Sequence, residues 1–307
     1  MSERLDRRAR LRDVLGKVGV WTFALDRQRA QEEREAARRI EALGYPVLWL
    51  PEGFRSKDAM AHAGLILSAT DRITVATGIA SIWARDPVSM ANGARILGDA
   101  YRGRFVLGIG VSHRPSVEGR GAHRYERPLA RMQAYLDAMG RAPYPVEDPG
   151  ELPPMVLAAL GPRMLGLAAE AAEGAHTYFV PVEHTARARD VLGPEPVLAT
   201  ELAVVLESDA DRARRIARGY MDYYLNAENY VSNLRRLGWA EGDLAAGGSD
   251  RLVDAIVAWG DVDAVNRRVL EHLDAGADHV CVQVLEEDPA EIGLAQLEEL
   301  APALLEA

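Results

Sequence analysis

The sequence predicts an α/β fold of the (β/α)8 TIM-barrel type, formed as a single domain over residues 1–307. Three observations support this prediction. Short apolar runs alternate with helical stretches along the chain. The runs are continuously apolar, which is typical of parallel strands buried on both faces. Eight such units within this length match one barrel with insertions.

Eight strands are predicted, nearly all followed by a helix. The strands cover residues 17–21, 47–50, 73–77, 105–109, 155–159, 175–180, 197–206 and 279–285. The helices cover 27–43, 58–68, 87–97, 128–139, 162–172, 185–192, 209–225 and 262–273, and a further helix ends the chain. Gly44 suits the position after a helix, while Asp86 and Pro87 suit an N-cap and the first helical turn.

Two segments interrupt this rhythm. Residues 111–127, after strand four, are rich in Gly, Arg and His without periodicity, and they predict an inserted loop. Residues 226–260 predict helices broken by glycines, inserted before the eighth helix. The alternative fold is a doubly wound sheet, which normally has Gly-x-Gly-x-x-Gly after its first strand. Residues 22–26 contain no glycine.

Composition excludes several classes of protein. The net charge of −10 argues against a nucleic-acid or anionic membrane partner. A single cysteine, Cys281, excludes a disulfide framework, and no histidine forms a metal-type pair with a carboxylate, so no metal is expected. No apolar run reaches the ~18–20 residues of a spanning helix. Residues 1–12 do not resemble a signal peptide, so a cytoplasmic location is expected.

Residues at strand exits are the candidate site residues, because barrel active sites lie at the carboxyl ends of the strands. Aromatic side chains gather there and predict a substrate pocket for a flat apolar ligand: Trp21, Phe23, Phe54 and Trp83, with Tyr178 nearby. The alternative is that barrel mouths simply collect large side chains.

Two polar residues are the catalytic candidates. Glu52 directly follows a buried strand, where a carboxylate is costly unless it is paired or functional. His113 follows the fourth strand and could donate to a ligand or carry a proton. The alternative for Glu52 is a surface or salt-bridged glutamate.

Two features suggest an anionic ligand. Gly161 and Pro162 open a helix whose free amides could bind phosphate. Residues 111–131 carry a local excess of positive charge in an acidic chain, through Arg114, Arg120, Arg124, Arg127 and Arg131. The alternatives are an ordinary turn and a solvated loop.

Five motifs occur in order and resemble the luciferase-like monooxygenase superfamily, in its branch of coenzyme F420-dependent oxidoreductases. They are residues 73–79 with 84–87, 107–115, 157–165, 174–180 and 275–280. The resemblance extends from about residue 17 to 285 and implies a bacterial-luciferase-like barrel. It also implies a homodimer that acts on a small molecule.

The resemblance further implies a flavin or deazaflavin, with its ring over the third strand and its phosphate near strands five and six. By position, Gly78–Ile79 matches a non-prolyl cis peptide behind the ring, and His113 matches a residue at the ring edge. Glu52 matches polar residues at the ring. The phosphate-binding turn and its flanks would be Gly161, Pro162, Arg163, Thr177 and Tyr178.

The functional prediction is hydride transfer between coenzyme F420 and a small organic substrate, since the positive patch suits the polyglutamate tail of that coenzyme. One alternative is an FMN-dependent monooxygenase with a separate reductase. Another is a non-enzymatic flavin-binding or degenerate barrel.

Overall fold

Eight parallel strands close into a barrel in the structure, a computed structural model that describes residues 2–53, 55–119, 121, 123–146 and 152–306. They are β1 (Val18–Trp21), β2 (Val47–Leu50), β3 (Thr74–Thr77), β5 (Phe105–Gly110), β6 (Met155–Ala158), β7 (Gly174–Thr177), β8 (Val197–Val205) and β10 (His279–Val284). The ring closes because β10 pairs with both β1 and β8. The predicted (β/α)8 fold is therefore confirmed.

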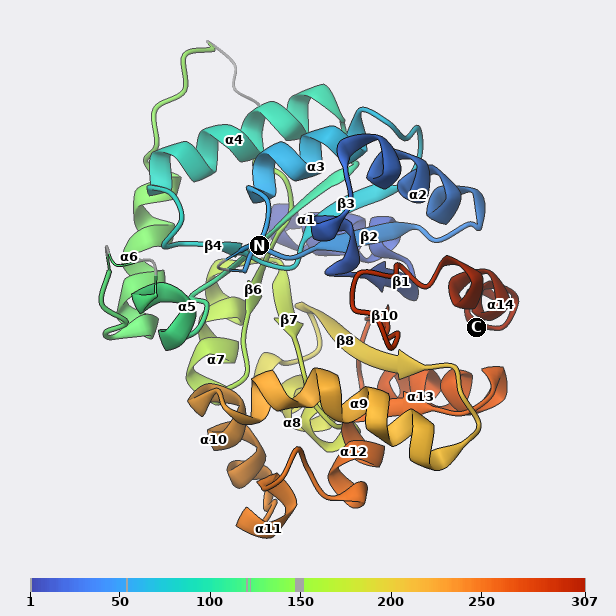
Figure 1. The fold of residues 1–307 in the computed structure, drawn as a ribbon. Coiled ribbons are helices and arrows are strands. Elements are labelled where there is room, and N and C mark those ends of the chain that lie inside the picture. The colour runs from blue at the N-terminus through green and yellow to red at the C-terminus, as the bar shows by residue number, and fades with distance from the viewer. Residues whose placement is uncertain (1, 54, 120, 122, 147–151, 307) are drawn as a thin grey trace.

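Helices surround the barrel as predicted (Figure 1). The outer layer consists of α2 (Ala30–Ala42), α3 (Ala59–Leu67), α4 (Pro87–Ala100), α6 (Pro128–Gly140), α7 (Pro162–Ala171), α8 (Val182–Leu192), α9 (Ala210–Leu225), α13 (Val262–Asp274) and α14 (Leu294–Leu305). Asp86 caps α4 by accepting from the Val88 and Ser89 amides, and Pro87 begins the helix, as expected. In the part of the chain that the structure describes, no helix combines the length and apolar character needed to cross a membrane.

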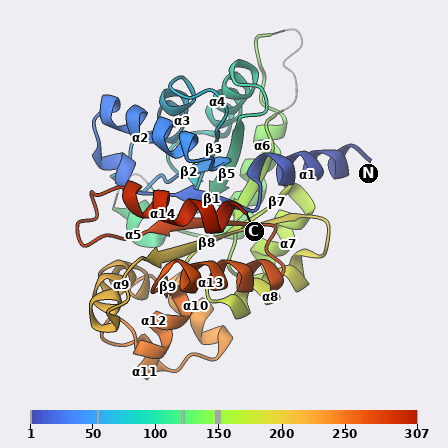
Figure 2. The same ribbon diagram turned by 90° about the vertical axis from the view of Figure 1, so that its right-hand side faces the viewer.

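Helix α1 (Ser2–Leu15) was not predicted from the sequence. It lies at one end of the barrel, with α5 (Arg114–Glu118) and α9 toward the other (Figure 2). Its Leu11 and Leu15 are buried with inward residues of the strands. Arg7 pairs with Glu173 just before β7, and Arg12 pairs with Asp278 just before β10. The amino ends of the strands are therefore covered by α1.

Both predicted insertions are present, with more regular structure than expected. Segment 111–127 contains the short helix α5, where the sequence predicted only a loop. The second insertion forms α10 (Glu228–Leu237), α11 (Glu241–Leu244), α12 (Asp250–Ile256) and the strand β9 (Val257–Trp259), which extends the sheet at β8. A second short strand, β4 (Ala80–Ser81), pairs with β5, and the 3-10 helix η1 (Ala24–Arg27) follows β1.

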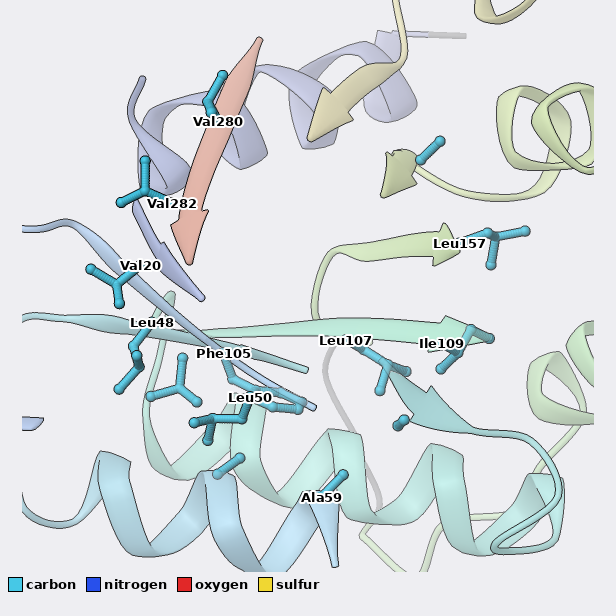
Figure 3. Close-up of a cluster of buried hydrophobic side chains, with 14 of the residues drawn as sticks. Val20, Leu48, Leu50, Ala59, Phe105, Leu107, Ile109, Leu157, Val280 and Val282 are labelled. Atoms are coloured by element: carbon cyan, nitrogen blue, oxygen red, sulfur yellow. The ribbon is translucent and has the colours of Figure 1, made fainter. Parts of the chain in front are cut away.

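Each strand directs alternate side chains outward and inward. The outward residues form an apolar layer beneath the helices, and Figure 3 shows Val20, Leu48, Leu107 and Leu157 within it. Inside the barrel, Trp49 stacks on His176 with ring centroids 4.7 Å apart and donates to Nε2 of His279 over 3.1 Å. The barrel interior is a packed core beneath the strand exits.

One inward glycine is required where β3 approaches β5. A Cβ built on Gly108 would lie 1.9 Å from the carbonyl oxygen of Thr77. The Thr77 hydroxyl also donates to the Gly108 carbonyl at 2.6 Å and accepts from its amide at 2.9 Å. Backbone atoms therefore fill the space that any other side chain would need.

We predict that Gly108→Ala destabilises the protein by an amount at the upper end of the ~1–3 kcal/mol typical of overpacking, because backbone cannot move aside easily. Gly140→Ala at the end of α6 is the control, since a Cβ there meets nothing within 4 Å. Urea denaturation of both variants measures the difference. Equal midpoints would show that β3 and β5 can separate without cost.

Candidate functional site

A cavity of about 1550 Å³ opens at the carboxyl ends of the barrel strands. It exceeds the usual 300–1,000 Å³ of a small-molecule pocket, so it has room for a cofactor and a substrate together. The loops after the strands line it together with α9 and α10. Eight residues expected from the sequence lie in its wall: Trp21, Phe23, Glu52, Gly78, Ile79, His113, Gly161 and Tyr178.

The other expected residues lie elsewhere. Phe54 falls outside the described residues. Trp83 is buried under segment 111–127, where its indole N–H donates to the Val111 carbonyl at 2.8 Å and Arg131 lies 4.8 Å above its ring. Thr177 precedes the inward Tyr178, so it points to the helical side and donates to the Thr200 hydroxyl at 3.0 Å. Neither Trp83 nor Thr177 is among the cavity-lining residues.

The wall of the cavity at the end of β3 is apolar. The Gly78–Ile79 peptide bond is cis, as the resemblance implied, and the side chain of Ile79 is partly exposed to the cavity. A Cβ on Gly78 would lie 2.5 Å from Nε1 of Trp21, so only glycine lets the indole approach. That indole nitrogen is buried and has no hydrogen-bond partner among the described residues.

Glu52 is an ion-paired carboxylate. Its Oε1 accepts from the Ala59 amide at 3.2 Å, and its Oε2 accepts from the Ser81 amide at 2.7 Å. Arg85 donates to Oε2 at 2.9 Å and also to Oε1. Burial lowers the pKa of Arg85, but the hydrogen bonds and charge of Glu52 outweigh this and raise it. Both oxygens are therefore engaged, and the salt-bridged alternative describes Glu52 better than a free acid or base.

His113 is a neutral imidazole at the cavity wall. Burial lowers its pKa to about 4, against the hydrogen bond to Asn229, which raises it. Its Nδ1 lies 3.1 Å from Oδ1 of Asn229, so Nδ1 carries the proton. Its Nε2 lies 3.5 Å from the Tyr230 hydroxyl and offers a lone pair. His113 can therefore accept a hydrogen bond near neutral pH, and it brings no positive charge.

The cavity wall contains a cluster of tyrosines, of which only Tyr178 was predicted from the sequence. The Tyr178 hydroxyl donates to Oε1 of Gln283 at 2.7 Å and lies 2.9 Å from the Tyr224 hydroxyl. Tyr220 and Tyr230 pack around this pair. Tyr220 and Tyr224 are spaced four residues apart and so share one face of α9, a pattern that the sequence shows. The sequence pattern does not show, however, that this face of α9 lies against the cavity.

The first turn of α7 is a candidate anion site. The amides of Met164 and Leu165 donate to the Gly161 carbonyl, which leaves those of Gly161 and Arg163 as candidate donors. The Arg236 guanidinium of α10 lies beside Gly161, with Nη2 3.7 Å from a Cβ built there. Pro162 and Arg163 are exposed at the start of the helix. Positive charge and free amides at a helix amino terminus suit a phosphate.

Asn233 adds a second sign of a ligand at this turn. Its Oδ1 accepts from Arg236 at 3.2 Å. Its Nδ2 is buried and has no partner within the described part of the chain. An anion held by Arg236 would supply an acceptor close to this donor.

The described arginines of segment 111–131 do not line the cavity, although other residues of that segment, such as His113 and Tyr125, do. Arg114 pairs with Glu118 at 2.9 Å on the exposed surface, and Arg131 covers Trp83. Arg120 lies outside the described residues. The arginines that do line the cavity are Arg27, Arg55 and Arg215. The net charge of a segment does not show which way its side chains point, and tail binding by this segment stays a prediction.

The chain matches the family model described as luciferase-like monooxygenase over residues 16–279. A Mycobacterium tuberculosis protein named as a coenzyme F420-dependent oxidoreductase is 28% identical over 188 residues, which cover 52% of this chain and 54% of that protein. The chain thus matches about half the length of this relative.

Solved structures share the whole fold. The coenzyme F420-dependent tetrahydromethanopterin reductase of Methanopyrus kandleri has a TM-score of 0.75 at 17% identity, covering 95% of this chain and 99% of that one. The oxygenating constituent of 3,6-diketocamphane monooxygenase from Pseudomonas putida, in complex with FMN, has a TM-score of 0.67 at 18% identity, with coverage of 94% and 98%. At these identities the likeness concerns the fold.

We predict that Arg85→Met lowers the free energy of unfolding by about 3–5 kcal/mol, because it leaves the Glu52 carboxylate buried without its cation. Adding Glu52→Gln should recover part of this loss, since no charge then remains buried. Arg55→Met, at an exposed cavity arginine, is the control and should change little. Urea denaturation supplies the values, and strictly additive losses would contradict a direct pair.

Proposed function

This chain belongs to the luciferase-like monooxygenase family, and from that premise we propose that it is an oxidoreductase that binds the deazaflavin coenzyme F420. In this proposal it exchanges hydride between the coenzyme and a small organic substrate. One observation carries the proposal: the apolar wall at the end of β3 and the candidate anion site at Gly161 face the same large cavity. A ring system joined to a phosphate needs both features within reach of each other.

The residues present fit such a group. Trp21, Gly78 and Ile79 would form the surface behind the ring, and the unpartnered indole N–H of Trp21 would have an acceptor nearby. The Gly161 and Arg163 amides and the Arg236 guanidinium would hold the phosphate. The name of the Mycobacterium tuberculosis relative supports F420 as the coenzyme.

When bound, the reduced coenzyme supplies a hydride, and the chain's own residues position the partners. The Glu52–Arg85 pair fixes the exits of β2 and β4 next to the ring wall. His113 stays neutral and offers Nε2 as a hydrogen-bond acceptor. The apolar wall keeps water away from the reacting atoms, which protects a hydride donor.

A second candidate is an FMN-dependent monooxygenase that takes reduced flavin from a separate reductase. The observation that favours it concerns the arginine-rich segment: its described arginines do not line the cavity and so give no support to a polyanionic tail. The FMN-bound monooxygenase of the same fold is consistent with this candidate.

We also propose that the protein forms a homodimer, for which light scattering at micromolar concentration is the test.

Titration of the ligand-free protein with F420 and with FMN, followed by fluorescence, separates these candidates. We predict that F420 binds more tightly than FMN. Tight binding of FMN with none of F420 would support the monooxygenase instead. Failure of both would favour a degenerate barrel without a coenzyme.

We predict that Gly161→Val weakens binding of either coenzyme roughly tenfold or more, that is by ~1.4 kcal/mol, because its side chain covers the donor amides. The fold should tolerate the change: φ of Gly161 is −89°, and an added Cβ meets Arg236 only at an ordinary 3.7 Å. Gly166→Val in the same helix is the control, since nothing lies within 4 Å of its Cβ. Undiminished binding to Gly161→Val would place the phosphate elsewhere.

A further inference from the structure

Glu201 is a buried carboxyl group inside the barrel. It lies on β8 opposite Cys281 of β10, and it is 1% exposed. The described part of the chain holds no arginine, lysine or histidine within 4.0 Å of it, so it differs from the paired Glu52. A lone buried carboxylate is costly, so such a group tends to keep its proton.

The two oxygens of Glu201 differ in their contacts. Oε2 accepts from the Phe179 amide at 3.1 Å. Phe179 has φ of +56°, in the left-handed region that non-glycine residues rarely adopt, and this hydrogen bond helps to hold it there. The Tyr220 hydroxyl lies nearer to Oε1, at 3.3 Å, than to Oε2, at 3.5 Å. Because Oε2 already serves as an acceptor, the carboxyl proton belongs on Oε1, facing Tyr220.

Tyr220 connects this buried acid to the cavity. It lines the cavity, whereas Glu201 lies behind it. When Glu201 donates to the Tyr220 oxygen, the phenol hydrogen is free to point into the cavity. When Glu201 is ionised, the phenol must turn back and donate to it. The protonation state of Glu201 therefore decides whether the cavity has a hydrogen-bond donor at this point.

The surroundings of Glu201 favour its neutral form. Burial raises its pKa to about 8, and the hydrogen bonds from Phe179 and Tyr220 only partly oppose this. The titratable groups that interact with it are all neutral at that pH and come from the exit of β7, from α9, α10 and β10: Tyr178, Tyr220, Tyr224, Tyr230 and Cys281. The pKa of the thiol and of each phenol is raised, chiefly by burial.

We propose that Glu201 and Tyr220 form a proton relay that serves a carbonyl substrate, an aldehyde or a ketone, bound in the cavity. Tyr220 is the catalytic acid that touches the substrate oxygen, and Glu201 is the positioning residue that supplies Tyr220 with its proton. This inference rests on the proposed function, because the hydride comes from the reduced deazaflavin.

The step balances in atoms and charge. The hydride forms a C–H bond at the carbonyl carbon, and the C=O π electrons move to oxygen. That oxygen takes the proton of Tyr220 as an O–H bond forms, and Tyr220 takes the proton of Glu201. The products are an alcohol, the oxidised coenzyme, which releases to solvent the proton left after hydride loss, and the Glu201 carboxylate, which regains a proton from solvent. The reverse sequence oxidises an alcohol.

The protonation of Glu201 can be tested on the ligand-free protein. We predict that infrared spectroscopy at pH 7 shows a neutral carboxylic acid band that is absent from Glu201→Gln and retained by Glu299→Gln, an exposed control. An ionised Glu201 would overturn the relay whatever the coenzyme proves to be.

Stability gives an independent readout. The folded pKa of Glu201 exceeds its unfolded value near 4.5, so its contribution to stability is lost as pH rises from about 4.5 to about 8. Glu201→Gln lacks this loss, so its Tm relative to the wild type should increase with pH over that window. A Tm difference that does not change with pH would contradict a proton bound to Glu201.

The relay itself is tested in F420-loaded protein with cyclohexanone and benzaldehyde as probes. Tyr220→Phe should slow reduction about a hundredfold or more, as for loss of a general acid, whereas Tyr101→Phe, away from the cavity, should not. In the wild type the rate should fall as pH rises through about 8, and Glu201→Gln should abolish this fall. An unchanged pH profile in Glu201→Gln would remove the relay but leave the proposed function intact. Tight F420 binding without reduction of either probe would overturn the carbonyl assignment.

Discussion

A single carboxylate organises the mouth of this barrel. Glu52, at the end of β2, accepts hydrogen bonds from the first amide of α3, from β4 and from Arg85. The exit of β2, the start of α3 and the segment from β4 to Arg85 are thereby fixed to one another beside the Gly78–Ile79 wall. A water molecule could satisfy each donor separately, but only a charged group with two oxygens can hold all of them in one arrangement. The position of the apolar wall depends on this pair.

The barrel was predictable because each of its strands is a short, continuous apolar run. The site was partly predictable, because the fold brings all strand exits to one end, and Trp21, Glu52 and His113 do lie there together. Position along the chain does not give the direction of a side chain. Trp83 follows a strand exit, but its indole N–H donates to the Val111 carbonyl in the next loop instead of facing the cavity. Thr177 lies one residue from Tyr178, yet its side chain faces the helices.

The features that the sequence did not show depend on contacts between distant segments. Helix α1 is held in place by its buried Leu11 and Leu15 and by ion pairs with Glu173 and Asp278, which lie far away in the sequence. Tyrosines of α9 line the cavity together with Tyr230 of the inserted helix α10. Arg236, from the same insertion, places a positive charge at the first turn of α7. The arginines after β5 were the ones expected from the sequence to bind an anion, but those that the structure describes do not line the cavity. An insertion can therefore contribute as much to a site as the strand exits themselves.

The pairing of β1 with β10 also affects how the chain acquires its structure. Val18 lies opposite Val280, so the first strand gains its second neighbour only after nearly the whole chain exists. During synthesis one edge of β1 stays open, and open edges invite pairing with other chains. Helix α1 has the same delay, since its anchor Asp278 emerges just before β10. Closure of the ring is thus a late event that joins segments far apart in the sequence. Before closure the nascent sheet has an open edge and is prone to aggregate, whereas the closed barrel has none.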